Sequence, residues 1–291
     1  MNRIVTLLDG SRLEVGLTGA PSGRVVMLPG AKKSVFGQEA DGLRAWGVDP
    51  ELGRRFVEGL SDEFRVLYFD YESHLFENPR PDRLTPDDLA ADLLLIADAM
   101  GVETFSYYGY SWLALAGLQL AIRTDRLDSL IMGGYPPYEG PYREMLVVTE
   151  KTYEQAVRNR DAAERPPGPN VSPEEIDWNN VQVTIDPDQT KQFYTLYRSL
   201  TDFNDKAVQD RLKMPRLAFA GEKDTIVYGE NFGSVTVDIG GIMRRNKEKL
   251  ESLGWDVEIV EGPGMGHTQA MQPAAVLPLI KPWLMKHLSS R

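Results

Sequence analysis

The stretch YYGYSWLALAG, residues 107–117, indicates the fold of the whole chain. It ends an apolar segment, places Ser111 two residues after Gly109, and continues into a run of small and apolar residues typical of a helix. This pattern is typical of a nucleophilic serine on a sharp strand-to-helix turn. Such turns usually carry a second glycine, and here Leu113 takes its place. Because Gly117 keeps the helix face small, we expect the turn to form, with the helix shifted outward.

Apolar runs and helical patterns alternate on both sides of this stretch. The N-terminal segment 3–17 alternates around Asp9-Gly10, which predicts a hairpin. Short apolar runs predict buried strands, at residues 23–30, 64–70, 102–110, 127–134, 214–221 and 256–262. Helical spacing between several of them predicts an α/β sheet with mostly parallel strands and helices on both faces.

The alternation stops between residues 135 and 213. This segment is polar, aromatic and proline-rich, with a proline-rich part at 164–175 and two predicted helices near 142–158 and 189–200. We therefore divide the chain into a first core part (1–134), an inserted, mainly helical cap (135–213) and a second core part (214–291). The final helix is predicted from about residue 273, with a kink or restart at Pro278 and Pro282.

A serine nucleophile needs a base, and the base needs an orienting acid. Asp224 follows the strand at 214–221, and His267 follows the strand at 256–262 through a glycine-rich turn. Since carboxyl ends of parallel strands meet at one edge of a sheet, Ser111, Asp224 and His267 are expected at the same edge. Glu222 is the competitor for the acid, and His74 and His287 are the other histidines; we favour Asp224 and His267 by their positions.

With these residues the chain resembles the α/β-hydrolase superfamily over nearly its full length. The matching segments are VVMLPG (25–30), VLYFDYESH (66–74), the helix, strand and turn at 85–112, GEKDTIV (221–227) and the segment from 264 to 284. The resemblance implies a Ser111–His267–Asp224 triad and a helical cap. Many relatives read His-Gly where this chain has Pro29-Gly30.

An oxyanion hole is built from backbone N–H groups, so the loss of that histidine need not remove it. We predict Trp112 N–H and Ala31 N–H as the donors. Lys32 either is a solvated lysine or attracts a substrate carboxylate. Three aromatic residues are further candidates for substrate binding, although such clusters are as often plain core: Tyr110, Tyr135 and Tyr138.

Composition excludes several functional classes. The 291 residues carry 32 Lys and Arg against 43 Asp and Glu, a net charge of −11, so we do not expect nucleic acid or anionic membranes as partners. The absence of cysteine excludes disulfides and thiolate chemistry. No zinc-type histidine pair or phosphate loop occurs, so no metal or cofactor is expected. No secretory signal or membrane span is recognised, which favours a cytoplasmic protein, monomeric or homodimeric, acting on a small molecule.

These features predict a cofactor-independent serine hydrolase that cleaves an ester or lactone of a small or medium apolar molecule. The same triad also suits cleavage of a carbon–carbon bond or a lyase reaction, and the fold alone does not choose between them. An aminopeptidase for N-terminal proline is a weaker alternative, with Glu139 and Glu144 as candidates to bind the amine. A non-catalytic ligand receptor is the alternative outside enzymes, because Leu113 and the LPGAKK loop depart from the usual pattern.

Overall fold

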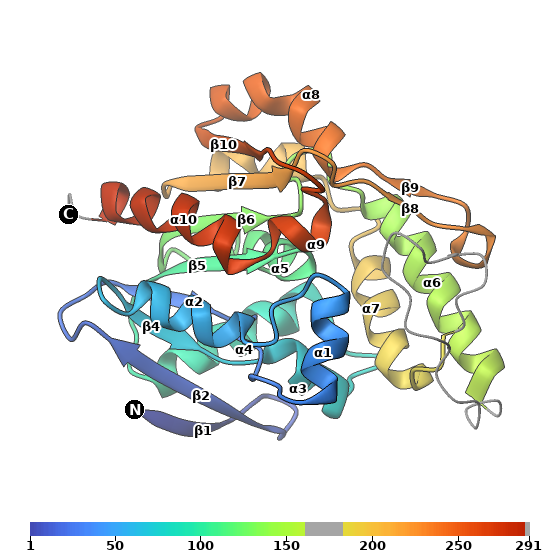
Figure 1. Ribbon diagram of the computed structural model, residues 1–291, viewed down its shortest axis with the longest axis horizontal. Coiled ribbons are helices and arrows are strands. Elements are labelled where there is room, and N and C mark those ends of the chain that lie inside the picture. Colours follow the sequence, from blue (N-terminus) through green and yellow to red (C-terminus); the bar gives the residue numbers. More distant parts are fainter. Residues whose placement is uncertain (161–182, 289–291) are drawn as a thin grey trace.

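A computed structural model describes residues 1–160 and 183–288, and its centre is a mixed sheet of eight strands (Figure 1). The spatial order is β1-β2-β4-β3-β5-β6-β7-β10. The β1–β2 and β2–β4 pairs are antiparallel and the remaining pairs are parallel. The strands are β1 (Asn2–Thr6), β2 (Arg12–Gly19), β3 (Val25–Leu28), β4 (Arg65–Tyr68), β5 (Phe105–Tyr110), β6 (Leu127–Gly133), β7 (Arg216–Gly221) and β10 (Trp255–Val260). The predicted mostly parallel α/β sheet is confirmed.

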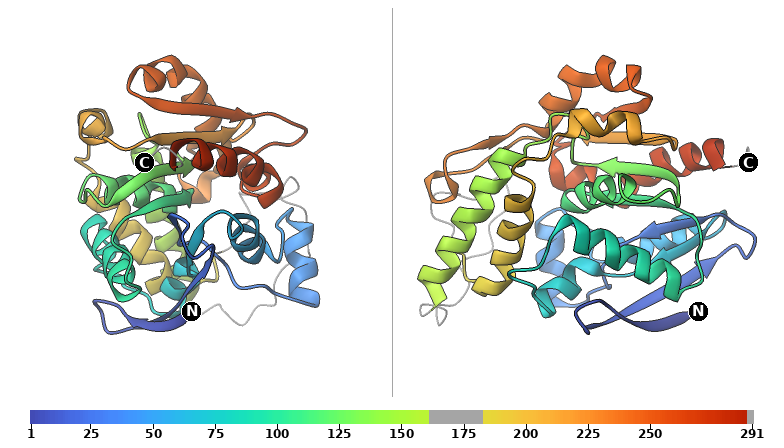
Figure 2. Two further views of the ribbon diagram at one scale, coloured as in Figure 1. Left: turned by 90° about the vertical axis from the view of Figure 1, so that its left-hand side faces the viewer. Right: turned by 180° about the vertical axis from the view of Figure 1, so that it is seen from behind.

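One face of the sheet is covered by α4 (Pro86–Ala99), α5 (Trp112–Ala121) and α8 (Ile239–Ser252) (Figure 2). Thr85 caps α4 by accepting a hydrogen bond from Asp88 N–H, and Pro86 occupies the first turn. Side chains alternate along β5, so Tyr107 faces this core while Tyr108 faces the opposite one. All ten residues of α5 are buried, which makes it the central helix of this layer.

The opposite face is covered by α2 (Leu52–Leu60) and α10 (Pro273–Leu288) (Figure 1). The predicted restart of the last helix is wrong, because α10 runs unbroken through Pro278 and Pro282. Both prolines lie on its exposed side. Each proline lacks the N–H that would bond the carbonyl group one turn earlier in the helix. On the exposed side that carbonyl can bind water instead, which lowers the free-energy cost of the proline.

Several short elements complete the core near the carboxyl ends of the strands. The sequence did not single them out, because helices of this length carry little periodic signal. They are α1 (Gln38–Ala45), α3 (Tyr71–Glu77), α9 (His267–Ala270), the 3₁₀ helix η4 (Glu230–Phe232) and the two-stranded ribbon β8 (Ile226–Val227) with β9 (Thr236–Val237).

The chain between β6 and β7 forms α6 (Tyr142–Asn159), α7 (Pro187–Ser199) and the 3₁₀ helix η3 (Asp205–Arg211). Helices α6 and α7 pack side by side beyond the carboxyl ends of the strands, and α6 also contacts η4 and β9 (Figures 1 and 2). The two helices match those predicted near 142–158 and 189–200. The predicted proline-rich part at 164–175 lies outside the described residues.

Candidate active site

Ser111 occupies a sharp turn between β5 and α5. Its φ of 56° and ψ of −130° lie in a region that non-glycine residues rarely adopt. Such a conformation costs about 1–3 kcal/mol and is found mainly at functional sites. Ser111 N–H donates to Gly133 O at 2.8 Å, which fixes the turn against the neighbouring strand.

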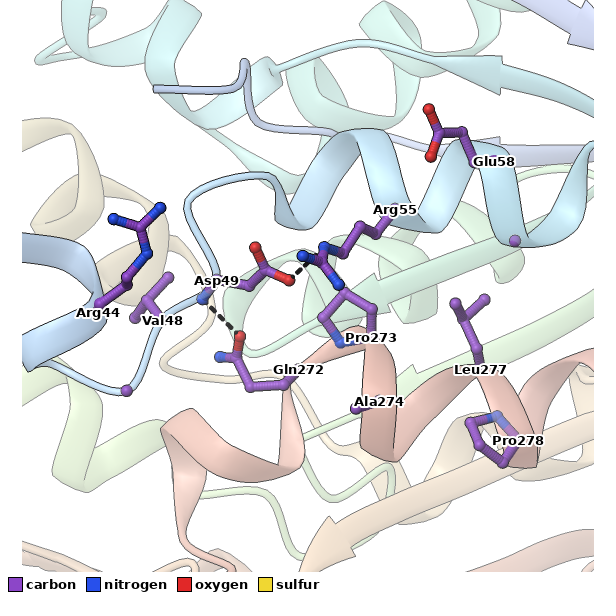
Figure 3. Close-up of a pocket in the computed structure, with 12 residues that line it drawn as sticks. Arg44, Val48, Asp49, Arg55, Glu58, Gln272, Pro273, Ala274, Leu277 and Pro278 are labelled. Carbon is purple, nitrogen blue, oxygen red and sulfur yellow. Dashed lines mark hydrogen bonds and ion pairs between the residues drawn. The ribbon is translucent and has the colours of Figure 1, made fainter. Parts of the chain in front are cut away.

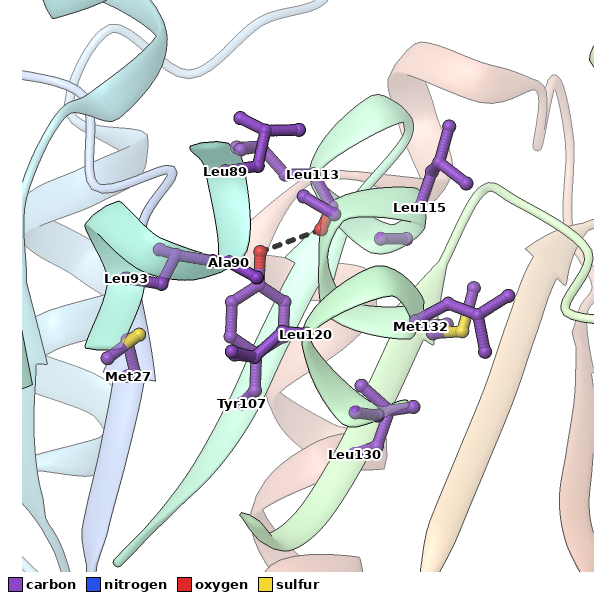
Figure 4. Packing of buried hydrophobic residues seen from close by; sticks show 14 of the residues in the cluster. Met27, Leu89, Ala90, Leu93, Tyr107, Leu113, Leu115, Leu120, Leu130 and Met132 are labelled. Atoms are coloured by element: carbon purple, nitrogen blue, oxygen red, sulfur yellow. Dashed lines mark hydrogen bonds between the residues drawn. The ribbon is translucent and has the colours of Figure 1, made fainter. Parts of the chain in front are cut away.

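Leu113 is accommodated without separating α5 from the sheet. A Cβ atom on Gly109 would collide with the carbonyl oxygen of Leu113, so the expected outward shift of the helix does not occur. Tyr107 OH donates to that oxygen at 2.7 Å, and the Leu113 side chain packs in the core (Figure 4). The Leu113 side chain also lies close to Gly30, so it supports the loop after β3.

Asp224 and His267 form a hydrogen-bonded pair. Nδ1 of His267 lies 3.0 Å from Oδ1 and 2.9 Å from Oδ2 of Asp224. Asp224 is fully buried, while the His267 side chain is 23% exposed. Tyr110 OH donates to His267 O at 2.7 Å and so holds the start of α9. An imidazole held through Nδ1 presents Nε2 for proton transfer.

Two cavities meet at Ser111. The larger one has a volume of 780 Å³ and is lined by Lys32, His74, Tyr110 and the loop after β3. The smaller one has a volume of 380 Å³ and lies between the sheet edge and helices α6 and α7. Four residues line both cavities: Glu72, Ser111, Trp112 and His267. Ser111 and His267 both line the two cavities, but no hydrogen bond joins their side chains within the described part of the chain. Catalytic hydrogen bonds often tighten only when substrate is bound.

The two predicted oxyanion donors differ in their surroundings. Trp112 is the first residue of α5, where an N–H has no acceptor within the helix. Ala31 N–H, in contrast, donates to Phe69 O at 3.1 Å. The Trp112 N–H therefore has no acceptor within its helix, while the Ala31 N–H is engaged by Phe69.

Glu72 is a residue at this site that sequence analysis missed. One carboxylate oxygen accepts from Trp112 Nε1 at 2.7 Å, and the other lies 2.5 Å from Lys32 Nζ. Burial opposes the charged form of Lys32, but the charge and hydrogen bond of Glu72 outweigh it and raise the Lys32 pKa. Glu72 follows β4 at the same sheet edge as the other candidates, and this position was the available signal.

The three predicted aromatic residues are not gathered in one place. Tyr110 lines the larger cavity, and burial first, then the charge of Asp224, raises its pKa well above the ordinary value. Tyr135 lines the smaller cavity. Tyr138 lines neither of these two cavities; its ring instead lies 5.2 Å from Lys206 Nζ.

The alternative acids and histidines have other partners. His74 is buried, with Nε2 2.9 Å from Ser11 Oγ, and burial together with the charge of Arg80 lowers its pKa. His287 pairs with Asp256 at 3.4 Å near the end of α10. Glu139 contacts Lys206 at 2.6 Å, and neither it nor Glu144 lines the two cavities at Ser111.

A further cavity of 840 Å³ lies between α2 and α10 and shares Val48 and Asp49 with the wall of the larger cavity at Ser111 (Figure 3). Asp49 is fixed there by Arg55 at 2.8 Å and by its own N–H, which donates to Gln272 Oε1 at 2.8 Å. None of the predicted site residues lines it.

Residues 1–160 and 183–288, which the structure describes, lack two kinds of feature. No cluster of three or more His, Cys, Asp or Glu side chains suited to a metal ion is found there. None of the helices in these ranges is both long and apolar enough to cross a membrane.

Comparison with solved structures places this arrangement among known folds. No protein-family model and no curated protein matches the chain. An epoxide hydrolase from metagenomes of hot environments is 20% identical, with a TM-score of 0.54 and coverage of 100% of this chain and 99% of the other. A thermophilic esterase from Thermogutta terrifontis is also 20% identical, with a TM-score of 0.54 and coverage of 99% of both chains.

The proline iminopeptidase of Mycobacterium smegmatis is 17% identical, with a TM-score of 0.54 and coverage of 100% of both chains. These similarities extend over the whole chain and concern its fold. Together with the strand order and the turn at Ser111, they show that this chain has the α/β-hydrolase fold.

Proposed function

We propose that the protein is a cofactor-independent serine hydrolase that cleaves a carboxylic ester or lactone of a small or medium apolar molecule. The observation that carries this proposal is the His267–Asp224 pair: His267 lines the same two cavities as Ser111 on its strained turn, and the buried Asp224 holds its imidazole. An esterase and an epoxide hydrolase among the structural neighbours are consistent with hydrolysis on this fold.

In the proposed mechanism Ser111 Oγ attacks the substrate carbonyl while His267 Nε2 takes its proton. Asp224 holds the imidazole through Nδ1 and stabilises its charged form. Trp112 N–H stabilises the oxyanion. His267 then protonates the leaving group, and the same residue activates water to cleave the acyl-enzyme.

The smaller cavity supports an apolar substrate. Its walls are mainly aromatic and aliphatic, and they come from the sheet edge and from α6 and α7. They include Phe76, Tyr135, Met145, Phe193, Ile226 and Val237. A pocket of 380 Å³ is within the range for small-molecule sites. We propose that residues 135–213 act as a cap over this pocket, and that the substrate is a small molecule rather than nucleic acid or membrane.

The proposal is tested with aryl esters that share one leaving group and differ in acyl length. Hydrolysis is expected for short and medium acyl groups, with kcat/KM falling once the acyl group exceeds the volume of the smaller cavity. Release of the aryl alcohol is followed by absorbance. If none of these esters and none of the matching lactones is hydrolysed, the result favours one of the alternatives: cleavage of a carbon–carbon bond, a lyase reaction or a non-catalytic receptor.

Replacing Asp224 with asparagine is expected to lower kcat by on the order of 10⁴-fold, because the amide does not hold His267 in the required tautomer. Steady-state kinetics on an aryl ester measures the effect, and circular dichroism checks the fold. Glu222→Gln is the matched control on the same loop. The assignment of the acid is wrong if Glu222→Gln is the impaired variant and Asp224→Asn keeps normal turnover.

A further inference from the structure

The three backbone N–H groups that directly follow Gly30 already have acceptors within the protein. Ala31 N–H donates to Phe69 O at 3.1 Å and Lys32 N–H donates to Gly30 O at 2.9 Å. Lys33 N–H points to Asp70 Oδ2 at 3.4 Å. An oxyanion hole generally combines at least two donors, so a partner for Trp112 N–H is needed from another group.

The backbone of this loop is held firmly in that orientation. Gly30 forms an antiparallel bridge with Asp70, and Tyr71 N–H donates to Pro29 O at 2.9 Å. On the other side α2 approaches so closely that a Cβ on Gly53 would collide with the backbone of Lys32. Turning the Ala31 N–H toward Ser111 would require these contacts to break.

The Lys32 side chain, in contrast, reaches Glu72, a residue that lines both cavities at Ser111. It lines the larger cavity together with Ser111, Trp112 and His267. Its ammonium lies 2.5 Å from one oxygen of Glu72, and the other oxygen of Glu72 binds the indole of Trp112, the residue next to the nucleophile. The ammonium has three N–H donors, so one bond to Glu72 leaves two for a substrate oxygen.

We propose that Lys32 is the second oxyanion donor, in place of a backbone N–H, and that Glu72 holds its ammonium beside the reacting carbonyl. This inference rests on the proposed serine-hydrolase function. When Ser111 Oγ bonds to the carbonyl carbon, the π electron pair moves to the carbonyl oxygen, and its negative charge accepts hydrogen bonds from Lys32 Nζ and Trp112 N–H. Lys32 keeps its proton throughout, and the pair returns when the leaving group departs.

Because Lys32 pairs with Glu72, a second role for Lys32 must be distinguished from direct contact with the oxyanion. An unpaired carboxylate near Ser111 would repel the oxyanion, so in this second role Lys32 acts only by neutralising Glu72. Glu72→Gln removes this charge and keeps an oxygen that can accept from the Trp112 indole. A neutralising role predicts that Lys32→Met is rescued by adding Glu72→Gln, and a direct contact predicts that it is not.

The test compares Lys32→Met, Lys32→Met/Glu72→Gln and Lys33→Met for hydrolysis of an aryl ester. It also measures their binding of an arylboronic acid, which forms a tetrahedral anion on serine. Lys32→Met is expected to lower kcat by about 10²–10³-fold with KM little changed, and to weaken boronate binding by a similar factor. Lys33→Met is the matched control, since its side chain is 79% exposed and lies 3.8 Å from Glu14.

The outcomes separate this inference from the proposed function. Unchanged kcat and boronate affinity in Lys32→Met, with Ser111→Ala inactive, overturn the role of Lys32 and leave the serine hydrolase intact. Recovery of wild-type turnover in the double variant also overturns it. Full activity in Ser111→Ala overturns both. Thermal melts check folding, and Lys32→Gln repeats the test if Lys32→Met does not fold.

Discussion

Replacing Ser111 with alanine is expected to abolish ester hydrolysis, with a fall in kcat of about 10⁶-fold, because no acyl-enzyme forms without the hydroxyl. The fold is expected to persist, since the change removes one oxygen from a side chain at the junction of two cavities. Steady-state kinetics with an aryl ester measures the activity, and circular dichroism melts measure stability.

Ser252→Ala is the matched control, because Ser252 lies at the end of α8 and donates only to Lys249 O. It should hydrolyse the ester at the wild-type rate. Turnover in Ser111→Ala within tenfold of the wild type would show that another group performs the chemistry.

Arg80→Met is expected to lower the free energy of unfolding by about 3–5 kcal/mol, the cost of breaking a buried ion pair by removing one partner. Arg80 lies 2.6 Å from Asp92 and 2.5 Å from Asp9, and Asp92 is fully buried. Tyr71 OH donates to the same oxygen of Asp92 at 2.6 Å. The substitution would leave the Asp92 carboxylate buried without its cation, at a point where the β1–β2 turn, α3 and α4 meet.

Denaturant unfolding measures this change, with Arg123→Met as the control. Arg123 pairs with Asp87 at 2.6 Å at the surface, where such pairs contribute about 0–1 kcal/mol. Adding Asp92→Leu to Arg80→Met should recover part of the loss. A change below 1 kcal/mol in Arg80→Met would contradict the role given to this network.

The sequence predicted the sheet and the places of the three candidate catalytic residues. Each of Ser111, Asp224 and His267 follows a run of apolar residues, and the topology of a parallel sheet is enough to bring such positions together. The two helices after β6 were also predictable, because both are long enough for a clear helical period. Helices α1, α2 and α3 were not, since each is short and lies in a stretch dominated by loops.

Other details depend on packing that no local pattern encodes. The direction of the Ala31 N–H is set by its bond to Phe69 O across the sheet edge. Tyr138 is an aromatic residue like Tyr135, yet its ring faces Lys206 while Tyr135 lines the smaller cavity. The place of Glu72 between Lys32 and Trp112 depends on the loop after β3 meeting the first turns of α3 and α5. Its position after β4 was the only sequence signal for it.

The central claim is that Ser111 is a nucleophile activated by His267, and covalent labelling tests it most directly. The protein is treated with a fluorophosphonate probe, and intact mass and peptide mapping locate the adduct. We predict rapid labelling at Ser111 alone, loss of the adduct in Ser111→Ala, and strongly slowed labelling in His267→Ala. A wild-type protein that folds, binds small apolar ligands and leaves Ser111 unlabelled would contradict the account.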